Sequence, residues 1–113
     1  MMERKSADST PLRPAQQILV VDDDRGIGDC VEMLLERAGH ASVVTRLGRD
    51  GLAQIERREF DLVITDLRLP DASGLDIVAA AKAAHPETQV ILMTSFSSVE
   101  SAIEALQIGR AHV

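Results

Sequence analysis

The sequence predicts an α/β fold in the form of a doubly wound parallel sheet. Three short apolar runs, at 18–21, 62–65 and 90–93, each end abruptly in polar residues. Such runs are typical of strands that are buried on both faces. Segments with helical periodicity separate the runs, and the alternation of strands with helices favours a parallel sheet with helices on both sides.

The first half of the chain predicts two strand–helix units. The strand at 18–21 precedes a helix over 27–38, whose apolar residues recur at helical spacing (Ile27, Val31, Leu34 and Leu35). Gly39 then stands where a glycine commonly ends a helix. A second strand is predicted over 41–45, followed by a short helix over 51–58 that turns Leu52 and Ile55 inward.

The second half predicts two more units. The strand at 62–65 ends in Asp66 and leads to an alanine-rich helix over 74–84. The strand at 90–93 precedes a capping-box pattern, which opens a last amphipathic helix over 98–109. We therefore expect four strand–helix units in one sheet.

Length and composition limit what the chain can be. Its 113 residues suffice for one domain, expected over 16–113, after a flexible polar leader at 1–15. The net charge of −6 argues against a nucleic-acid surface, which is normally basic. No apolar run reaches the roughly 18 residues of a membrane helix. The single cysteine, Cys30, suits a reducing compartment, so we expect a cytoplasmic protein.

Polar side chains follow three of the predicted strands. Asp22, Asp23 and Asp24 follow the first strand, Asp66 the third and Thr94 the fourth. Ligands bind at the carboxyl ends of parallel strands, so these groups should converge at one edge. Carboxylates this close repel one another unless a cation intervenes, and hard oxygen ligands favour Mg²⁺. A carboxylate beside Mg²⁺ can attack phosphorus, because the metal neutralises charge on the incoming phosphoryl oxygens.

Each of these residues also has a plainer interpretation. The acidic run alone could be a solvated helix N-cap, and Asp24 is expected to cap the next helix even if its neighbours bind metal. Asp66 alone could be a turn residue, and Thr94 alone a strand-end hydroxyl. The conjunction of the three strand ends favours the functional interpretation.

Three stretches together resemble the receiver domains of two-component response regulators. They are Ile-Leu-Val-Val-Asp-Asp-Asp at 18–24, Leu-Val-Ile-Thr-Asp-Leu-Arg-Leu-Pro-Asp-Ala-Ser-Gly-Leu-Asp at 62–76 and Val-Ile-Leu-Met-Thr-Ser at 90–95. Their order and approximate spacing are those of the family, and the resemblance covers about 17–109. The stretch 93–106 is similar to regulators of the nitrogen-regulation type, whose receiver precedes an ATPase and a DNA-binding domain.

The resemblance implies a role for each polar residue. Asp66 would be the phosphoacceptor, which receives a phosphoryl group from a sensor histidine kinase. Asp22 and Asp23 would be the acidic pair that binds Mg²⁺, with Asp23 the more direct ligand. Asp66 and the backbone carbonyl of Arg68 would complete the metal ligands, and Thr94 would be the switch hydroxyl.

The resemblance also implies fold and partners. The family has a flavodoxin-like sheet with strand order 2-1-3-4-5. Pro70 and Gly74 would shape the loop after the phosphoacceptor. The chain would be a signalling domain rather than an enzyme, with at most self-catalysed phosphotransfer and dephosphorylation. Its partners would be the kinase and an output domain or a second copy, with no membrane and no direct contact to nucleic acid.

The sequence departs from the family near its end. A receiver has a fifth strand with an aromatic switch residue and a lysine that pairs with the phosphoryl group. Here Val113 stands near the aromatic position, and the two lysines, Lys5 and Lys82, both precede Thr94. We therefore expect a truncated or frameshifted receiver lacking the fifth strand and fifth helix. The strand at 90–93 would be an exposed edge, and phosphotransfer would be impaired.

Three other functions compete with this one. Gly26-Ile27-Gly28 follows the first strand as in a dinucleotide-binding fold, but Val31 leaves the glycine fingerprint incomplete. A metal-dependent phosphatase with an aspartyl nucleophile would want a second acid where Arg68 stands. A phosphorylation-independent protein-binding module is the third, because it would not need the family lysine.

Overall fold

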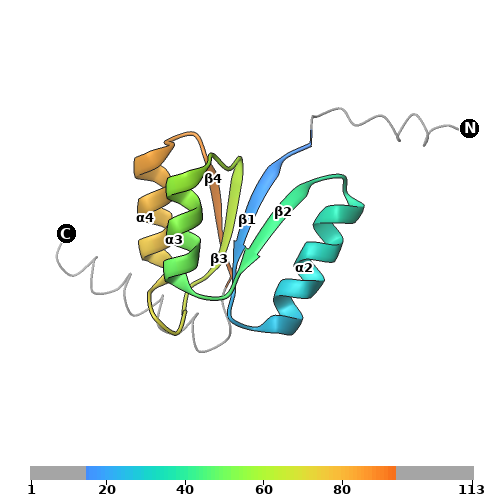
Figure 1. Cartoon of the computed structure of the whole chain (residues 1–113), viewed down its shortest axis with the longest axis horizontal. Coiled ribbons are helices and arrows are strands. Elements are labelled where there is room, and N and C mark those ends of the chain that lie inside the picture. The colour runs from blue at the N-terminus through green and yellow to red at the C-terminus, as the bar shows by residue number, and fades with distance from the viewer. Residues whose placement is uncertain (1–14, 94–113) are drawn as a thin grey trace, which may run out of the picture.

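The computed structural model describes residues 15–93 of the chain. The expected helix at 98–109, and the expected leader at 1–15 apart from its last residue, lie outside the described residues. Within 15–93, strands and helices alternate (Figure 1): β1 (Gln17–Val21), α2 (Arg25–Arg37), β2 (Ala41–Thr45), α3 (Gly48–Arg57), β3 (Leu62–Asp66), α4 (Gly74–Ala84) and β4 (Gln89–Met93). None of the described helices is long and apolar enough to cross a membrane.

The four described strands form one parallel sheet in the order β2-β1-β3-β4. This confirms the predicted parallel sheet and matches the first four positions of the order that the resemblance implies. The chain first adds β2 on one side of β1 and then crosses to add β3 on the other. The carboxyl ends of β1 and β3 therefore lie where the direction of growth reverses, which is where open α/β sheets bind ligands.

Helices cover both faces of the sheet (Figure 1). Helix α2 packs on β1 and β2, whereas α3 and α4 lie side by side on the opposite face. Strand β1 is buried on both sides: Leu19 and Val21 join Ile77 in the core under α3 and α4, while Ile18 and Val20 form the core under α2. This double burial explains why the β1 sequence is a continuous apolar run rather than an alternating one.

Local signals set the ends of the helices. The Asp24 carboxylate accepts the N–H of Ile27 at 3.0 Å and caps α2, as predicted. Gly39 has a φ of +90°, which confirms the glycine stop after this helix. Helices α2 and α3 begin two and three residues earlier than predicted, because their first turns contain polar residues that apolar periodicity does not register.

The two faces differ in how well they are covered. On α2, Val31 and Leu35 pack against the sheet, but Leu34 is 54% exposed although it shares their helical spacing. Ile91 pairs in register with Ile64, so it faces the α2 side, and it is 50% exposed. The α2 side thus carries the thinner part of the described core.

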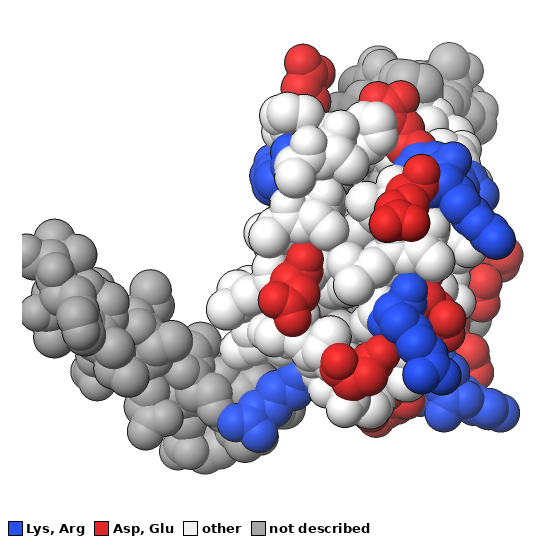
Figure 2. Space-filling view, turned by 60° about the vertical axis from the view of Figure 1, so that its left-hand side comes forward, with Lys and Arg blue, Asp and Glu red and all other residues white. Residues whose placement is uncertain are grey.

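On the α3–α4 side, acidic and basic side chains are interspersed over the surface (Figure 2).

Candidate functional site

Three of the predicted site residues lie together at the carboxyl edge of the sheet. Val21 pairs with Thr65, so Asp22 and Asp66 occupy the next positions on neighbouring strands. One carboxylate oxygen from each of Asp22, Asp23 and Asp66 lies within 4.8 Å of the other two. The strand register therefore brings together residues that are more than 40 positions apart in the sequence.

Asp22 is the buried member of this cluster, with 2% of its surface exposed. Its amide donates to the carbonyl of Thr45 at 3.0 Å, and its carboxylate accepts the N–H of Asp24 at 2.9 Å. Burial raises the pKa of the Asp22 carboxyl, and the nearby negative charges of Asp66 and Asp23 raise it further, against the lowering effect of the Asp24 hydrogen bond. A cation beside Asp22 would offset both effects, because it would stabilise the charged form of the carboxyl.

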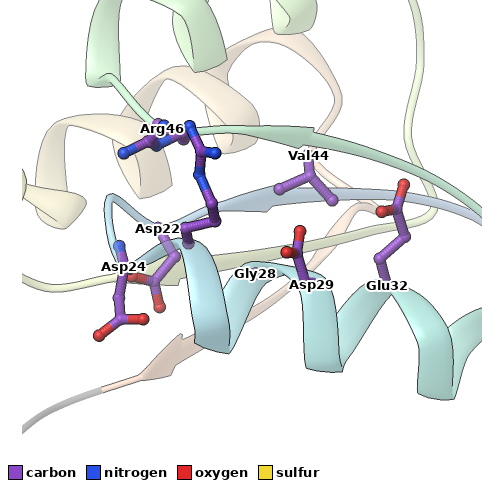
Figure 3. A pocket seen from close by; sticks show the side chains of 8 residues that line it. Asp22, Asp24, Gly28, Asp29, Glu32, Val44 and Arg46 are labelled. Atoms are coloured by element: carbon purple, nitrogen blue, oxygen red, sulfur yellow. Dashed lines mark hydrogen bonds between the residues drawn. The ribbon is translucent and has the colours of Figure 1, made fainter.

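A groove of about 370 Å³ runs from Asp22 along the gap between α2 and β2 (Figure 3). Asp29 and Glu32 of α2 lie on one wall, and Arg46, just after β2, lies at the end near Asp22. Gly28 allows the two elements to approach, since a Cβ there would lie 3.2 Å from Val44. The groove extends the polar surface beside the cluster with charges of both signs.

The loop after β3 places the third carboxylate. Asp66 Oδ1 accepts the N–H of Arg68 at 3.3 Å, which turns the chain immediately after the strand. The N–H of Gly74 donates to the carbonyl of Leu67 at 2.7 Å, and a Cβ at Gly74 would lie 2.2 Å from the carbonyl oxygen of Asp66. Helix α4 can therefore begin this close to the site only with a glycine.

The remaining predicted residues stand as follows. Thr94 lies outside the described residues, directly after Met93, whose carbonyl accepts the N–H of Leu67 at 3.0 Å. Arg68 lies in the loop two residues after Asp66, and its proposed contribution is a backbone oxygen. Asp24 caps α2 and is not one of the three clustered carboxylates.

The donor set of the cluster fits a hard divalent cation. The ligand oxygens around a magnesium ion lie roughly 3–4 Å apart, given metal–oxygen distances of about 2.1 Å, and the three carboxylate oxygens lie within a comparable span. All three donors are oxygens of acidic side chains, which is the chemistry that Mg²⁺ and Ca²⁺ prefer over softer metals. A bound cation would oppose the raised pKa of Asp22, because it would favour the charged form of this carboxyl.

Sequence reasoning missed Asp71, which lies in the loop between β3 and α4. Its carboxylate accepts the backbone N–H groups of Gly48 and Arg49, at 2.7 and 3.0 Å. The loop pattern in the sequence had drawn attention to Pro70 and Gly74 instead. An acidic residue at a loop tip gives a weak local signal, because its partners lie 22 and 23 residues earlier in the chain.

Comparison with known proteins gives a consistent result. The family described as response regulator receiver domain matches residues 18–113. The transcriptional regulatory protein ZraR of Salmonella typhimurium is 39% identical over 98 residues, which are 87% of this chain and 22% of ZraR. The chain therefore spans about a fifth of the length of this curated relative.

Solved structures agree. NtrX from Brucella abortus, in complex with ADP, is 33% identical with a TM-score of 0.71, over 82% of this chain and 22% of that one. A response regulator from Burkholderia pseudomallei is 25% identical, also with a TM-score of 0.71, over 81% of this chain and 54% of that one. The Burkholderia structure holds a phosphorylated aspartic acid, a calcium ion and citrate.

Proposed function

Because this chain belongs to the response regulator receiver domain family, we propose that it is the phosphoacceptor of a two-component phosphorelay. In this proposal, Asp66 accepts a phosphoryl group from a sensor histidine kinase. The observation that carries it is the convergence of Asp22, Asp23 and Asp66 within 4.8 Å at the switch point of the sheet. ZraR and NtrX, two relatives that are regulators of the nitrogen-regulation type, support the same assignment.

Asp22, Asp23 and Asp66, with the backbone carbonyl of Arg68, would hold Mg²⁺. When bound, the ion would neutralise charge on the phosphoryl oxygens. Asp23 is the exposed member of the acidic pair and is suited to direct contact with an arriving ion. Asp22 is held by hydrogen bonds to its neighbours, so its carboxylate would keep a fixed position under the site.

The transfer step follows from the position of Asp66. One of its carboxylate oxygens forms a new P–O bond as the P–N bond of a phosphohistidine breaks. The electron pair of the broken bond stays on the histidine nitrogen, which takes a proton from solvent. The hydrogen bond from the Arg68 N–H holds Asp66 Oδ1, which leaves Oδ2 as the candidate nucleophile.

Partners and downstream events are part of the same proposal. The Thr94 hydroxyl would turn toward the phosphoryl group and report its presence to an output domain or to a second copy of the chain. Such a relay would work in the cytoplasm and would not require direct contact with nucleic acid. The chain would act as a signalling domain whose own chemistry is limited to accepting and losing the phosphoryl group.

Acetyl phosphate with Mg²⁺ tests the proposal directly. The sequence contains no Trp or Tyr, so intact mass spectrometry and NMR serve better than fluorescence. We expect the natural chain to gain one phosphoryl group and beryllofluoride with Mg²⁺ to shift its amide resonances. Asp66→Asn should show neither effect, whereas Asp50→Asn, a charge-matched change on α3, should behave like the natural chain. Labelling of Asp66→Asn at the natural rate would refute Asp66 as the acceptor.

A phosphorylation-independent binding module is the second candidate. It is favoured by the position of Lys82, whose ammonium donates to the carbonyls of Pro86 and Thr88 at the turn between α4 and β4. This lysine lies at the amino-terminal edge of the sheet, away from Asp66, and is not placed to pair with a phosphoryl group. If the natural chain neither gains mass nor responds to beryllofluoride, and binds a kinase domain as tightly as Asp66→Asn does, this second function holds instead.

A further inference from the structure

The segment between β3 and α4 is a closed loop rather than an open connection. Arg68 and Ser73 form an isolated antiparallel bridge, and the N–H of Leu69 donates to the carbonyl of Ala72 at 3.1 Å. At the base of the loop, the N–H of Gly74 donates to the carbonyl of Leu67 at 2.7 Å. The loop therefore folds back on itself, with its tip at 70–71.

The tip of this loop is held by a neighbouring helix. The Asp71 carboxylate accepts one N–H on each of its oxygens, from Gly48 at 2.7 Å and from Arg49 at 3.0 Å, at the start of α3. Leu47, the N-cap residue of α3, has no side-chain cap hydrogen bond, so Asp71 supplies from the loop what the cap position lacks. These hydrogen bonds, with the charge of Arg49, lower the pKa of the Asp71 carboxyl.

The helix and the loop are fitted closely to each other. A Cβ at Gly48 would lie 2.6 Å from the Cβ of Ala72, so a glycine is required where the loop crosses the start of α3. Leu69 packs against the core under α3 and α4. The tip is thus fixed by Asp71, one side by Leu69 and the base by Gly74.

We propose that Asp71 is a positioning residue that fixes the loop bearing the Arg68 carbonyl by holding the loop tip against the start of α3. This inference rests on the proposed function, since the Arg68 carbonyl matters as a ligand only if the cluster binds Mg²⁺. Arg68 lies between the fixed base and the fixed tip, so its backbone has little freedom while both attachments hold. Release of the tip would remove one of the attachments beside Arg68 and leave those at Leu69 and at the base, so its carbonyl would be held less firmly.

A cap that merely stabilises α3 would behave differently from a positioning residue. Loss of a cap lowers stability and leaves the metal affinity of a folded molecule unchanged. Loss of a positioning contact lowers the affinity of the folded molecule, by roughly 10-fold where groups behind a metal ligand have been removed. Metal affinity of the folded chain therefore separates the two roles.

The test compares the full natural chain with Asp71→Ala, Asp71→Asn and Asp50→Ala. Asp50→Ala is the matched control, because it removes one carboxylate from the first turn of α3. Hydrogen exchange of the Gly48 and Arg49 amides, in Mg²⁺-free buffer, reports the two hydrogen bonds. NMR titration with Mg²⁺, at a temperature where thermal melts show every variant folded, reports the affinity.

We expect Asp71→Ala to lose protection at both amides and to bind Mg²⁺ roughly 10-fold more weakly. Asp71→Asn keeps one acceptor oxygen and should fall between Asp71→Ala and the natural chain; it carries the test if Asp71→Ala does not fold. Asp50→Ala should match the natural chain. Lost protection with unchanged Mg²⁺ affinity would reduce Asp71 to a cap and overturn the inference. Failure of the natural chain itself to bind Mg²⁺ would instead refute the proposed function.

Discussion

At the amino-terminal edge of the sheet, the carboxylate of Asp61 accepts the backbone N–H of Gln17 at 2.7 Å, whereas at the carboxyl-terminal edge Asp22, Asp23 and Asp66 face one another. Asp61 joins the starts of three strands, because its own N–H donates to Gln17 and its carbonyl accepts from Gln89. Its charge is therefore used for structure. The charges at the opposite edge are brought together without an opposite charge among the three, and this leaves them available for a cation.

Other groups at the amino-terminal edge also have partners inside the protein. The hydroxyl of Thr88 donates to the carbonyl of Phe60 at 2.8 Å, the Nδ1 of His40 accepts the N–H of Gln16 at 3.0 Å, and His85 lies 3.1 Å from Glu59. An acidic residue beside a strand is therefore not by itself a functional signal. The carboxyl edge differs because two further carboxylates, those of Asp23 and Asp66, lie beside the buried carboxylate of Asp22.

The largest difference in stability between the two edges should come from substituting one glycine at each edge, Gly74 and Gly39. Gly74→Ala places a Cβ 2.2 Å from the backbone oxygen of Asp66 and should cost about 3 kcal/mol or more of unfolding free energy. Gly39→Ala, at the amino-terminal edge, meets no atom within 4 Å and should cost about 1–2 kcal/mol through its positive φ alone. Urea unfolding followed by far-UV circular dichroism measures both. Equal losses of stability would mean that the loop after β3 shifts enough to accommodate the added methyl group at the start of α4.

The next largest effect is a change in stability that has opposite signs at the two edges when an aspartate is replaced by asparagine. Asp22→Asn keeps an acceptor for the Asp24 N–H but removes a buried charge, so it should stabilise the Mg²⁺-free protein by about 1 kcal/mol, or roughly 4–8 °C in Tm. Asp61→Asn removes a charge that a backbone N–H stabilises and should lower Tm by up to a similar amount. Thermal melts with and without Mg²⁺ measure this, and Mg²⁺ should no longer raise the Tm of Asp22→Asn. A loss of stability in Asp22→Asn would contradict the repulsion at the cluster.

The pH dependence of stability should show two opposite phases. The pKa of Asp22 in the folded protein lies above its ordinary value of 3.8. Its charged carboxylate therefore destabilises the folded protein at neutral pH, and this destabilisation disappears as pH falls through the raised pKa. The folded pKa of Asp71 lies below 3.8, so its contribution is complete above that pH and is lost as pH falls further. Melts across pH in Mg²⁺-free buffer should show the first phase missing in Asp22→Asn and the second weakened in Asp71→Asn. Profiles parallel to that of the natural chain would contradict both assignments.

The smallest effect is expected at the exposed pair Glu59 and His85. Glu59→Gln should change the unfolding free energy by less than about 0.5 kcal/mol, because exposed ion pairs gain little in water. Urea unfolding at low and high salt measures it. A loss several times larger would show that the amino-terminal edge depends on ion pairing as well as on its hydrogen bonds.

Much of the fold was predictable because its signals are local. The runs at 18–21 and 62–65 are buried on both faces, Asp24 caps α2 and Gly39 ends it, as the sequence indicated. The residues at which the strands end can also be located from the local sequence. The convergence of Asp22 and Asp66 then follows once their strands are parallel neighbours. Exposure of Leu34 was not predictable, because helical spacing does not tell how much sheet a helix covers.

The sequence by itself determined the order of the elements, the polar residues at the strand ends and the family to which they belong. Only the tertiary structure decided that Asp61 serves the backbone at the opposite edge, and that Asp71 holds the start of α3. The physical reason is that propensity, capping and burial patterns depend on residues near in sequence. The partner of a carboxylate depends on which N–H group or charge the folded chain brings beside it, from 22 to 44 residues away.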